Sequence, residues 1–142
     1  MIHCCCERQT DFGPNPYVTN VTRKAMQNTN FRTALWTGCY AQMTLMCIPV
    51  GTDIGPEIHE DTDQIIRIEE GFALVKMGEG ECKPDVQVRV CRGDTIFVPA
   101  GIRHNIINMG RMPLKASSIY APTHHPAGTV QRTKKEAEDA QY

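Results

Sequence analysis

The chain has 142 residues, the size of one ordinary domain and enough to bury a hydrophobic core without disulfide support. Its formal net charge of −1 at pH 7 gives no basic field to attract nucleic acid, and no apolar run approaches membrane-spanning length. Nucleic acid and the lipid bilayer are therefore not expected partners.

Cysteine usage and the first residues predict a cytoplasmic protein. No early segment has the composition of a secretion signal. The cysteine count of 7 is odd, and in a reducing compartment we interpret Cys39, Cys47 and Cys91 as small buried apolar residues rather than disulfide partners. The adjacent cysteines at positions 4–6, beside His3, suit zinc in composition. Because neighbouring residues cannot easily all face one ion, we expect a reactive or incidental terminal cluster.

The chain begins with a segment of low regularity and continues with short strand-like runs. Residues 11–30 are rich in Asn, Pro, Thr and Gly and predict an extended arm. From Phe31 onward, apolar β-prone runs are separated by turn residues, a spacing typical of an antiparallel sandwich or barrel. The predicted strands are 33–37, 42–50, 64–77, 86–90, 95–99, 104–108 and 114–120.

Local signals refine this outline. Glu69 and Glu70 precede Gly71, which can adopt positive φ, and we predict a hairpin there with both glutamates on the wet surface. Thr133 and Glu136 have the spacing of a capping box before strong helix formers, which predicts a short C-terminal helix. The expected organisation is an arm over 1–30, a barrel over 31–122, and a C-terminal loop and helix over 123–142.

Four residues stand out as possible metal ligands. Glu57 and His59 are two positions apart, so in an extended chain both leave the same face. Gln64 opens the next apolar run, in which alternation places it on one face with Ile66 and Ile68. His104 follows a turn over residues 99–101 that would return it toward the first cluster.

The spacing of these residues resembles the two cupin signatures. In the first signature, the residues Gly, His, His, Glu and Gly are separated in turn by five, one, three or four, and six other residues. In the second signature, the residues Gly, Pro, Gly, His and Asn are separated in turn by five, one, two and three other residues. The corresponding residues here are Gly51, Glu57, His59, Gln64 and Gly71, and then Gly93, Pro99, Gly101, His104 and Asn108. The segments FRTALWTG, DQIIRIEEG, IYAP and HHPAGTVQRTK are similar to bacterial single-domain cupins often labelled as resembling mannose-6-phosphate isomerase.

This resemblance implies an all-β cupin double-stranded β-helix, or jelly-roll barrel, that holds one divalent metal ion through Glu57, His59, Gln64 and His104. The chain departs from the family at two positions, with Glu57 where the family usually has His and Gln64 where it usually has Glu. The ligand set keeps a formal charge of about −1, so binding of Fe, Mn, Ni, Co or Zn remains expected. Asp63 is a competing candidate for this ligand, because the first cupin signature allows either three or four residues between its second His and its Glu.

An alternative interpretation is a barrel that has lost its metal site, in which His59 and His104 only make internal hydrogen bonds. Other residues have mainly structural interpretations. We expect Asn108 to make a hydrogen bond near a strand end, and Trp36 and Tyr40 to be core aromatics rather than sugar-stacking residues.

The remaining charged and imidazole side chains give weaker signals. Three arginines, Arg32, Arg67 and Arg103, are possible contacts for a substrate carboxylate or phosphate, but alternation points Arg67 out of the barrel. His124 and His125 lie in a C-terminal loop whose possible roles are to close over the pocket or to reach a neighbouring subunit, and solvated histidines are the default expectation.

Three functions follow from the ligand set and the resemblance. The first is a metal-dependent enzyme, isomerase-like, acting on a small sugar or sugar acid, with Glu57 or a bound water moving the proton. The second is a non-haem iron dioxygenase, and the third is a binding or sensing module without turnover. Cupins of this size commonly pair through their sheets, so we also expect a homodimer to which the N-terminal arm could contribute a strand.

Overall fold

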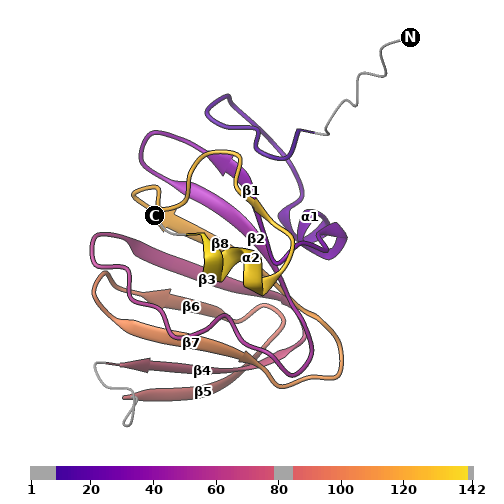
Figure 1. The fold of residues 1–142 in the computed structure, drawn as a ribbon, viewed down its shortest axis with the longest axis vertical. Coiled ribbons are helices and arrows are strands. Elements are labelled where there is room, and N and C mark those ends of the chain that lie inside the picture. The colour runs from indigo at the N-terminus through magenta and orange to yellow at the C-terminus, as the bar shows by residue number, and fades with distance from the viewer. Residues whose placement is uncertain (1–8, 79–84, 141–142) are drawn as a thin grey trace.

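The computed structural model describes residues 9–78 and 85–140 of the chain. Two antiparallel sheets form the body of the molecule, one with six strands in the order β6-β3-β8-β2-β1-β9 and one with three in the order β5-β4-β7 (Figure 1). The elements are α1 (Val21–Gln27), β1 (Arg32–Thr37), β2 (Gln42–Ile48), β3 (Asp63–Glu70), β4 (Phe72–Gly78), β5 (Val86–Cys91), β6 (Thr95–Val98), β7 (Arg103–Asn108), β8 (Leu114–Ala121), β9 (Val130–Gln131) and α2 (Lys134–Asp139).

The core lies between the two sheets because alternating apolar residues of both face inward. Strand β3 shows this pattern, with Gln64, Ile66 and Ile68 buried and Ile65 and Arg67 exposed. The inward residues of the other strands complete one cluster that includes Met46, Ile48, Ala73, Val75, Ile96, Val98, Ile106, Leu114 and Ala116. The jelly-roll prediction and the outward direction of Arg67 are both confirmed.

The predicted hairpin at Gly71 is wrong. Strand β3 pairs with β6 and β8, whereas β4 pairs with β5 and β7, so the chain changes sheets at Gly71. Gly71 has a φ of 106°, and a Cβ there would lie 3.1 Å from Leu114 Cδ1. The glycine is needed for a corner between sheets, a role with the same local signal as a tight reversal.

The arm is also not extended throughout, because residues Val21–Gln27 form helix α1. Asn20 caps this helix by accepting a hydrogen bond from the Arg23 backbone N–H. The described part of the arm packs on the barrel of its own chain, where the Phe12 N–H donates to the Leu35 carbonyl over 2.9 Å. A second small apolar cluster of Ala25, Leu35 and Leu45, with Phe12 packed against it, fills the space between the arm and the outer face of the sheet.

Helix α2 confirms the predicted helix and its Thr133 N-cap, but Glu136 Oε2 accepts from the Arg132 N–H and not from the Thr133 N–H that a full capping box requires. Thr133 Oγ1 accepts from the Glu136 N–H over 3.1 Å. The two-residue strand β9, which the sequence pattern did not indicate, pairs with β1 just before this helix. It extends the six-stranded sheet and places Gln131 opposite Arg32.

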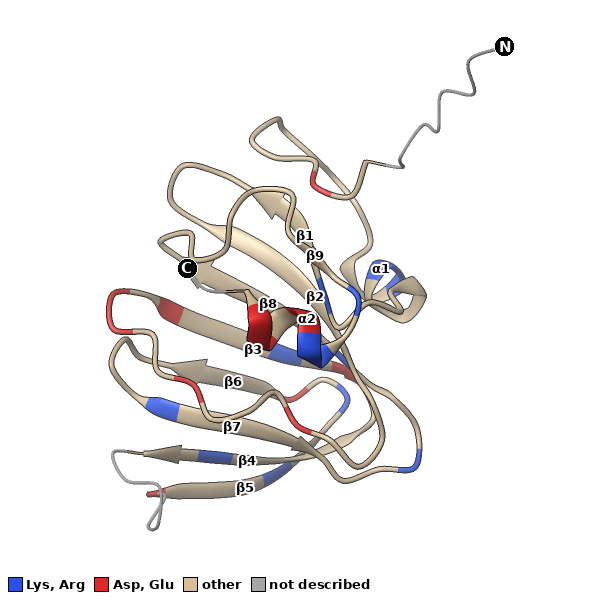
Figure 2. Cartoon of the chain, viewed as in Figure 1, with Lys and Arg blue, Asp and Glu red and all other residues tan. Residues whose placement is uncertain are grey.

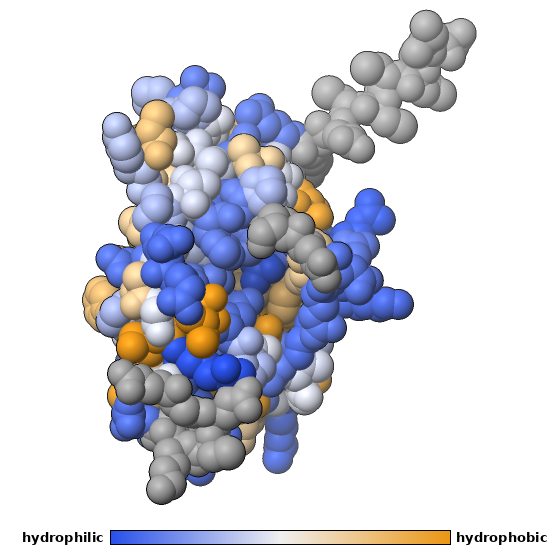
Figure 3. Space-filling model, turned by 60° about the vertical axis from the view of Figure 1, so that its left-hand side comes forward, coloured by the Kyte–Doolittle hydropathy of each residue, from blue (hydrophilic) through white to orange (hydrophobic). Residues whose placement is uncertain are grey.

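Surface chemistry is mixed over most of the molecule. Figure 2 shows acidic and basic residues interspersed along the strands, helices and loops of the described chain. Figure 3 shows apolar residues gathered mainly across the middle of the face it presents, at the level of β6 and β7. In the part of the chain that the structure describes, no helix is long and apolar enough to cross a membrane.

Candidate metal centre

Backbone pairing brings Glu57 and His104 together although 46 positions of sequence lie between them. The two residues form an isolated antiparallel bridge in which each N–H donates to the other carbonyl over 2.9 Å. His59 is tied to the turn before β7 because its carbonyl accepts from the Gly101 N–H over 2.8 Å. The segment that carries two of the ligands is thus fastened to the strand that carries the third.

The side chains of Glu57, His59 and His104 converge. One ligand atom of each lies within 4.8 Å of the others. Glu57 Oε2 is 3.3 Å from His59 Nε2 and 3.8 Å from His104 Nε2. Two imidazoles and one carboxylate at this separation can coordinate one divalent cation, the arrangement used by non-haem iron oxygenases and several zinc enzymes.

Burial and hydrogen bonding prepare His104 for this role. Burial lowers the pKa of His104 from its ordinary value of 6.5, against the opposing effects of the Ile102 carbonyl and Glu57. His104 Nδ1 lies 3.2 Å from the Ile102 carbonyl, which favours the tautomer with a proton on Nδ1 and a lone pair on Nε2. The neutral ring therefore presents its coordinating nitrogen to the site.

Glu57 is held in its ionised form. Burial alone would raise the pKa of its carboxyl group, but the neighbouring His59 ring and the positive charge of Arg32 outweigh burial and lower the pKa below its ordinary value of 4.5. Arg32 Nη2 lies 3.7 Å from Glu57 Oε1, while Oε2 faces the histidines. One carboxylate oxygen is thus available to a cation.

The polar atoms at the centre fit a bound cation. His59 Nε2, His104 Nε2 and Gln64 Oε1 are buried, and none has a hydrogen-bond partner within the described residues. Buried acceptors without partners are costly, and a cation held by the two imidazoles would satisfy both Nε2 atoms. The donor set of imidazole, carboxylate and amide oxygen suits a first-row divalent metal.

Gln64 and Asp63 take opposite directions from β3. Gln64 is 2 % exposed, and its Nε2 donates to Ser118 Oγ over 2.8 Å, which leaves Oε1 for the interior. Asp63 is exposed and accepts from the Ala100 N–H over 2.9 Å. Asp63 therefore belongs to the loop contact outside the barrel, and Gln64 is the better candidate for the fourth ligand.

Comparison with known proteins identifies the family. Residues 44–120 match the Cupin_2 family model, described as a cupin domain. The chain belongs to the cupins. This cupin is 52 % identical to the uncharacterized protein YrkC of Bacillus subtilis strain 168 over 127 residues, which is 89 % of the chain and 68 % of YrkC.

Solved structures agree with this assignment. The crystal structure of BH2720 from Bacillus halodurans has a TM-score of 0.91 and 50 % identity, with 92 % of this cupin and 99 % of BH2720 covered. A structure of Bacillus subtilis oxalate decarboxylase, a protein with Mn(II) centres, is 20 % identical with a TM-score of 0.55, covering 61 % of this cupin and 23 % of that chain. The latter likeness shows the fold alone.

Two histidines expected to be solvated lie beside the metal ligands instead. The ring of His124 lies 4.2 Å from that of His59, centroid to centroid, and His125 is buried. Gln42 holds the loop by donating to the His125 carbonyl and accepting from the His125 N–H, each over 2.9 Å. The expectation of solvated histidines is therefore wrong, because the loop packs against the candidate metal ligands. The sequence feature that could have predicted this placement is the pair of adjacent histidines directly after a strand.

Tyr120 is a further residue of the barrel interior, which the sequence pattern assigned to a strand without indicating a place beside the metal ligands. It is fully buried on β8 opposite Gln64, and its ring lies 5.8 Å from the His59 ring. Burial raises the pKa of its hydroxyl above the ordinary value of 10.0. The hydroxyl is therefore a neutral hydrogen-bonding group at physiological pH.

Several structural expectations need correction. Tyr40 is 85 % exposed rather than core, and Trp36 is half-buried on the outer face, where its Nε1 donates to the Asn15 carbonyl. Glu69 is buried rather than on the wet surface, because α1 covers that part of β3 and Thr22 Oγ1 donates to its carboxylate. Asn108 confirms its structural role by donating to the carbonyls of Ile48 and Met112.

The cysteines differ from expectation in burial. Cys39 and Cys91 are exposed, Cys47 is half-buried, and all three are free thiols. Each stands in or beside a strand, where alternation gave no reliable indication of which face it would take. The cluster at positions 4–6 and His3 lie outside the described residues.

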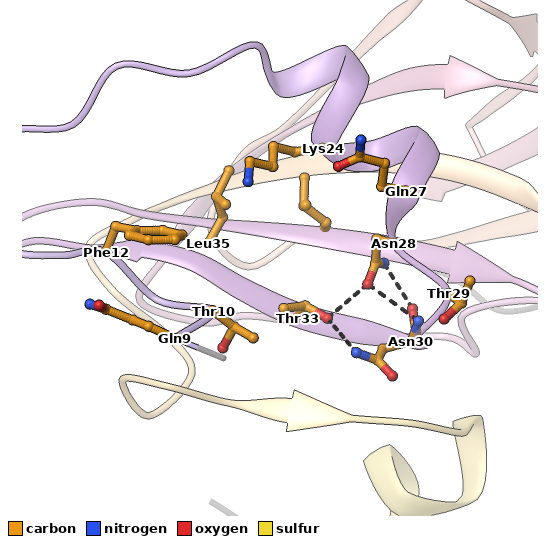
Figure 4. Close-up of a pocket in the computed structure, with 11 residues that line it drawn as sticks. Gln9, Thr10, Phe12, Lys24, Gln27, Asn28, Thr29, Asn30, Thr33 and Leu35 are labelled. Atoms are coloured by element: carbon orange, nitrogen blue, oxygen red, sulfur yellow. Dashed lines mark hydrogen bonds between the residues drawn. The ribbon is translucent and has the colours of Figure 1, made fainter. Parts of the chain in front are cut away.

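A separate cavity of about 370 Å³ lies outside the barrel, between α1 and β1. Figure 4 shows that its polar side chains bind one another: Asn28 Oδ1 accepts from Thr33 Oγ1, and Asn30 Nδ2 donates to the same hydroxyl. Lys24 lies over the Phe12 ring, 5.7 Å from its centroid. These contacts stabilise the arm and leave the barrel interior as the candidate functional site.

Proposed function

We propose that this cupin is a metal-dependent enzyme that isomerises a small oxygen-rich substrate, a sugar or a sugar acid. The observation that carries this proposal is the convergence of Glu57, His59 and His104 inside the barrel, with both histidine Nε2 atoms buried and without hydrogen-bond partners among the residues that the structure describes. A bound divalent metal would polarise adjacent substrate oxygens and so lower the barrier to proton transfer.

The protein residues divide the remaining work. Glu57, His59, His104 and Gln64 would hold the cation. Glu57 Oε1, which faces Arg32 rather than the histidines, is the proposed acceptor of the substrate proton. Its low pKa keeps the carboxylate ionised and ready to accept, although as a weak base. Tyr120 and the loop of His124 and His125 exclude water from this space.

A second function, a non-haem iron dioxygenase, is favoured by one observation. The converging ligands are two histidines and one carboxylate, and this set forms the facial triad of non-haem iron oxygenases. Oxygen consumption that requires iron, and that manganese or zinc does not support, would establish the dioxygenase and exclude the isomerase.

The first experiment measures the metal. Protein purified without a histidine tag is submitted to elemental analysis, and the metal found is restored before a screen of sugars and sugar acids. We expect about one divalent ion per chain in the native protein and close to none in His59→Ala and His104→Ala, because each substitution removes one of three main ligands. Asp63→Asn, a change just outside the barrel, is the matched control and should keep its metal. Equal metal content in all four proteins would contradict the site.

We also propose that the protein acts in the cytoplasm as a homodimer. The free thiols Cys39, Cys47 and Cys91 support a reducing compartment. An exposed apolar surface, which we call the corner face, supports the dimer: Phe72, Met109 and Met112 border a cavity of about 410 Å³ together with Glu70 and Arg111. Opposite charges on one face suit a two-fold contact, in which Glu70 of one copy meets Arg111 of the other.

A further inference from the structure

Arg32 is a buried cation at the centre of the barrel whose charge the protein itself only partly satisfies. The residue is 4 % exposed on β1. Its Nη1 donates to Gln131 Oε1 over 2.6 Å, and its Nη2 lies 3.7 Å from Glu57 Oε1, beyond hydrogen-bond distance. Nε is buried and has no hydrogen-bond partner within the described residues. A guanidinium with an unused donor in a closed space is a strong site for a carboxylate.

The cavity beside Arg32 is also bordered by Glu57, one of the candidate metal ligands. A space of about 280 Å³ beneath helix α2 is bordered by Arg32 and Glu57, with Phe31, Ile54, Pro56 and Ala137 as apolar walls. Its volume accommodates a small acid but not a large cofactor. Lys134 also borders this space, but Asp53 and Glu138 engage its ammonium group. Among the described residues that border this space, Arg32 is therefore the cation with a donor left without a hydrogen-bond partner.

The charge balance of the loaded site points to the same chemistry. The carboxylate of Glu57 and the guanidinium of Arg32 carry opposite charges of equal size. A divalent cation would then leave a formal surplus of two positive charges in a buried space. Such a surplus is costly unless an anion enters, and a neutral sugar cannot offset it.

We propose that Arg32 binds a carboxylate group of the substrate, which makes the substrate a small carboxylic acid, such as a sugar acid or a hydroxy acid, rather than a neutral sugar. This inference rests on the proposed function and narrows its substrate class. Arg32 is then a specificity-determining residue. Its Nε and Nη2 groups donate hydrogen bonds to the substrate carboxylate, while Gln131 holds the guanidinium in place.

The test compares matched ligand pairs that differ by a carboxylate in place of a hydroxymethyl group. Galacturonate is compared with galactose, and lactate with propane-1,2-diol, by isothermal titration calorimetry on the manganese-loaded and the metal-free protein. In at least one pair we expect the acid to bind about tenfold or more tightly than its neutral partner, because hydrogen bonds to a charged group are stronger than those to a neutral hydroxyl group. In Arg32→Met this preference should fall to about twofold or less. Arg67→Met, which removes an outward arginine of β3, should keep the native preference.

Other outcomes also decide the matter. Equal affinity for acid and neutral partner in the native protein, failure of both acids to bind, or an unchanged preference in Arg32→Met would overturn the proposal. If Arg32→Met does not fold, judged by circular dichroism, Arg32→Lys takes its place, and its single point charge should reduce the preference by about threefold or more. Elemental analysis of the same samples keeps the two proposals apart. A native protein that prefers acids but holds no metal would retain the role of Arg32 and refute the metal-dependent enzyme.

Discussion

Gln64 shows how one hydrogen bond can decide the role of a side chain. Its amide nitrogen is committed to Ser118 Oγ, so the carbonyl oxygen is the end presented to the barrel interior. An amide oxygen is a neutral and weak ligand, whereas the carboxylate usual at this position in cupins is charged. The affinity of this cupin for its metal should therefore be adjustable at one residue.

We expect Gln64→Glu to bind Mn²⁺ about tenfold more tightly than the native protein and Gln64→Leu to bind it more weakly, because carboxylate oxygen is the better ligand for a hard cation. Competition with a metal-sensitive dye measures both dissociation constants. Asp63→Asn changes a neighbouring side chain outside the barrel and serves as the control. Identical affinities for the glutamate and leucine variants would remove Gln64 from the ligand set.

The buried His125 imidazole makes the stability of the folded protein depend on pH. Burial, followed by the positive charge of Arg32 and the neighbouring His124 and His59, lowers its pKa from 6.5 to about 2. Between these pH values the unfolded chain binds a proton that the folded chain does not, so stability is present above pH 6.5 and is lost as the pH falls. The pKa of His104 and that of His124 are also lowered by burial and act in the same direction.

We therefore expect the free energy of unfolding of the metal-free protein to fall steadily between pH 6.5 and pH 5, when measured by urea denaturation. His125→Gln should make this fall shallower by about 1.4 kcal/mol per pH unit, the effect of one proton. The backbone contacts of His125 with Gln42 do not involve the imidazole, so the loop stays in place. A slope unchanged by the substitution would show that the pKa of His125 is the same in the folded and the unfolded chain.

At the scale of elements, helix α1 is fastened to the barrel by a buried carboxylate. Glu69 accepts from Ser117 Oγ on β8 and from Thr22 Oγ1 on α1, each over 2.8 Å. The register of β3 against β8 shifts between Ile68 and Glu70, next to the point where the helix covers the sheet. The helix thus depends on a polar contact as well as on the apolar cluster around Leu35.

We expect Thr22→Val to lower the free energy of unfolding by about 1 to 3 kcal/mol, because it leaves one oxygen of a buried carboxylate without its donor. Thr29→Val, at an exposed threonine just after the same helix, should change stability by only about 0.5 kcal/mol or less. Urea denaturation of the two variants beside the native protein makes the comparison. Equal losses from both substitutions would show that the Glu69 contact contributes nothing specific.

At the scale of the whole molecule, the corner face makes the proposed dimer testable. Phe72 is 65 % exposed and Met112 is 68 % exposed, which is unusual for large apolar side chains unless a partner covers them. Light scattering at micromolar concentration should give twice the mass of one chain. Met112→Glu should shift the protein to the monomer, whereas Val18→Glu, on the arm, should not.

Charge exchange gives a sharper check of the same contact. Glu70→Arg alone and Arg111→Glu alone each place like charges opposite one another in a two-fold dimer and should weaken it. An equimolar mixture of the two variants restores opposite charges at both positions and should form heterodimers. A native monomer, or a dimer indifferent to all of these changes, would place the partner surface elsewhere.

The parts of this molecule that sequence could predict are those encoded locally. Alternation along β3 predicted that Gln64 faces the interior and Arg67 the solvent, and the spacing of the two motifs predicted the meeting of Glu57, His59 and His104. Both depend on short stretches of chain, or on a spacing that a known family shares.

The features that sequence did not predict depend on contacts between distant segments. A glycine at position 71 is compatible with a hairpin and with a corner between two sheets, and only the strand pairing distinguishes the two. Glu69 reads as a surface residue until α1 is placed over it. His125 is buried only because Gln42, on a distant strand, holds its loop.

The reciprocal backbone pairing of Glu57 with His104 bears on when during synthesis a metal ion could bind. The two residues meet by pairing across β7, so both are available together only after the chain has been synthesised past that strand. A cation would therefore bind to a site that folding has already assembled.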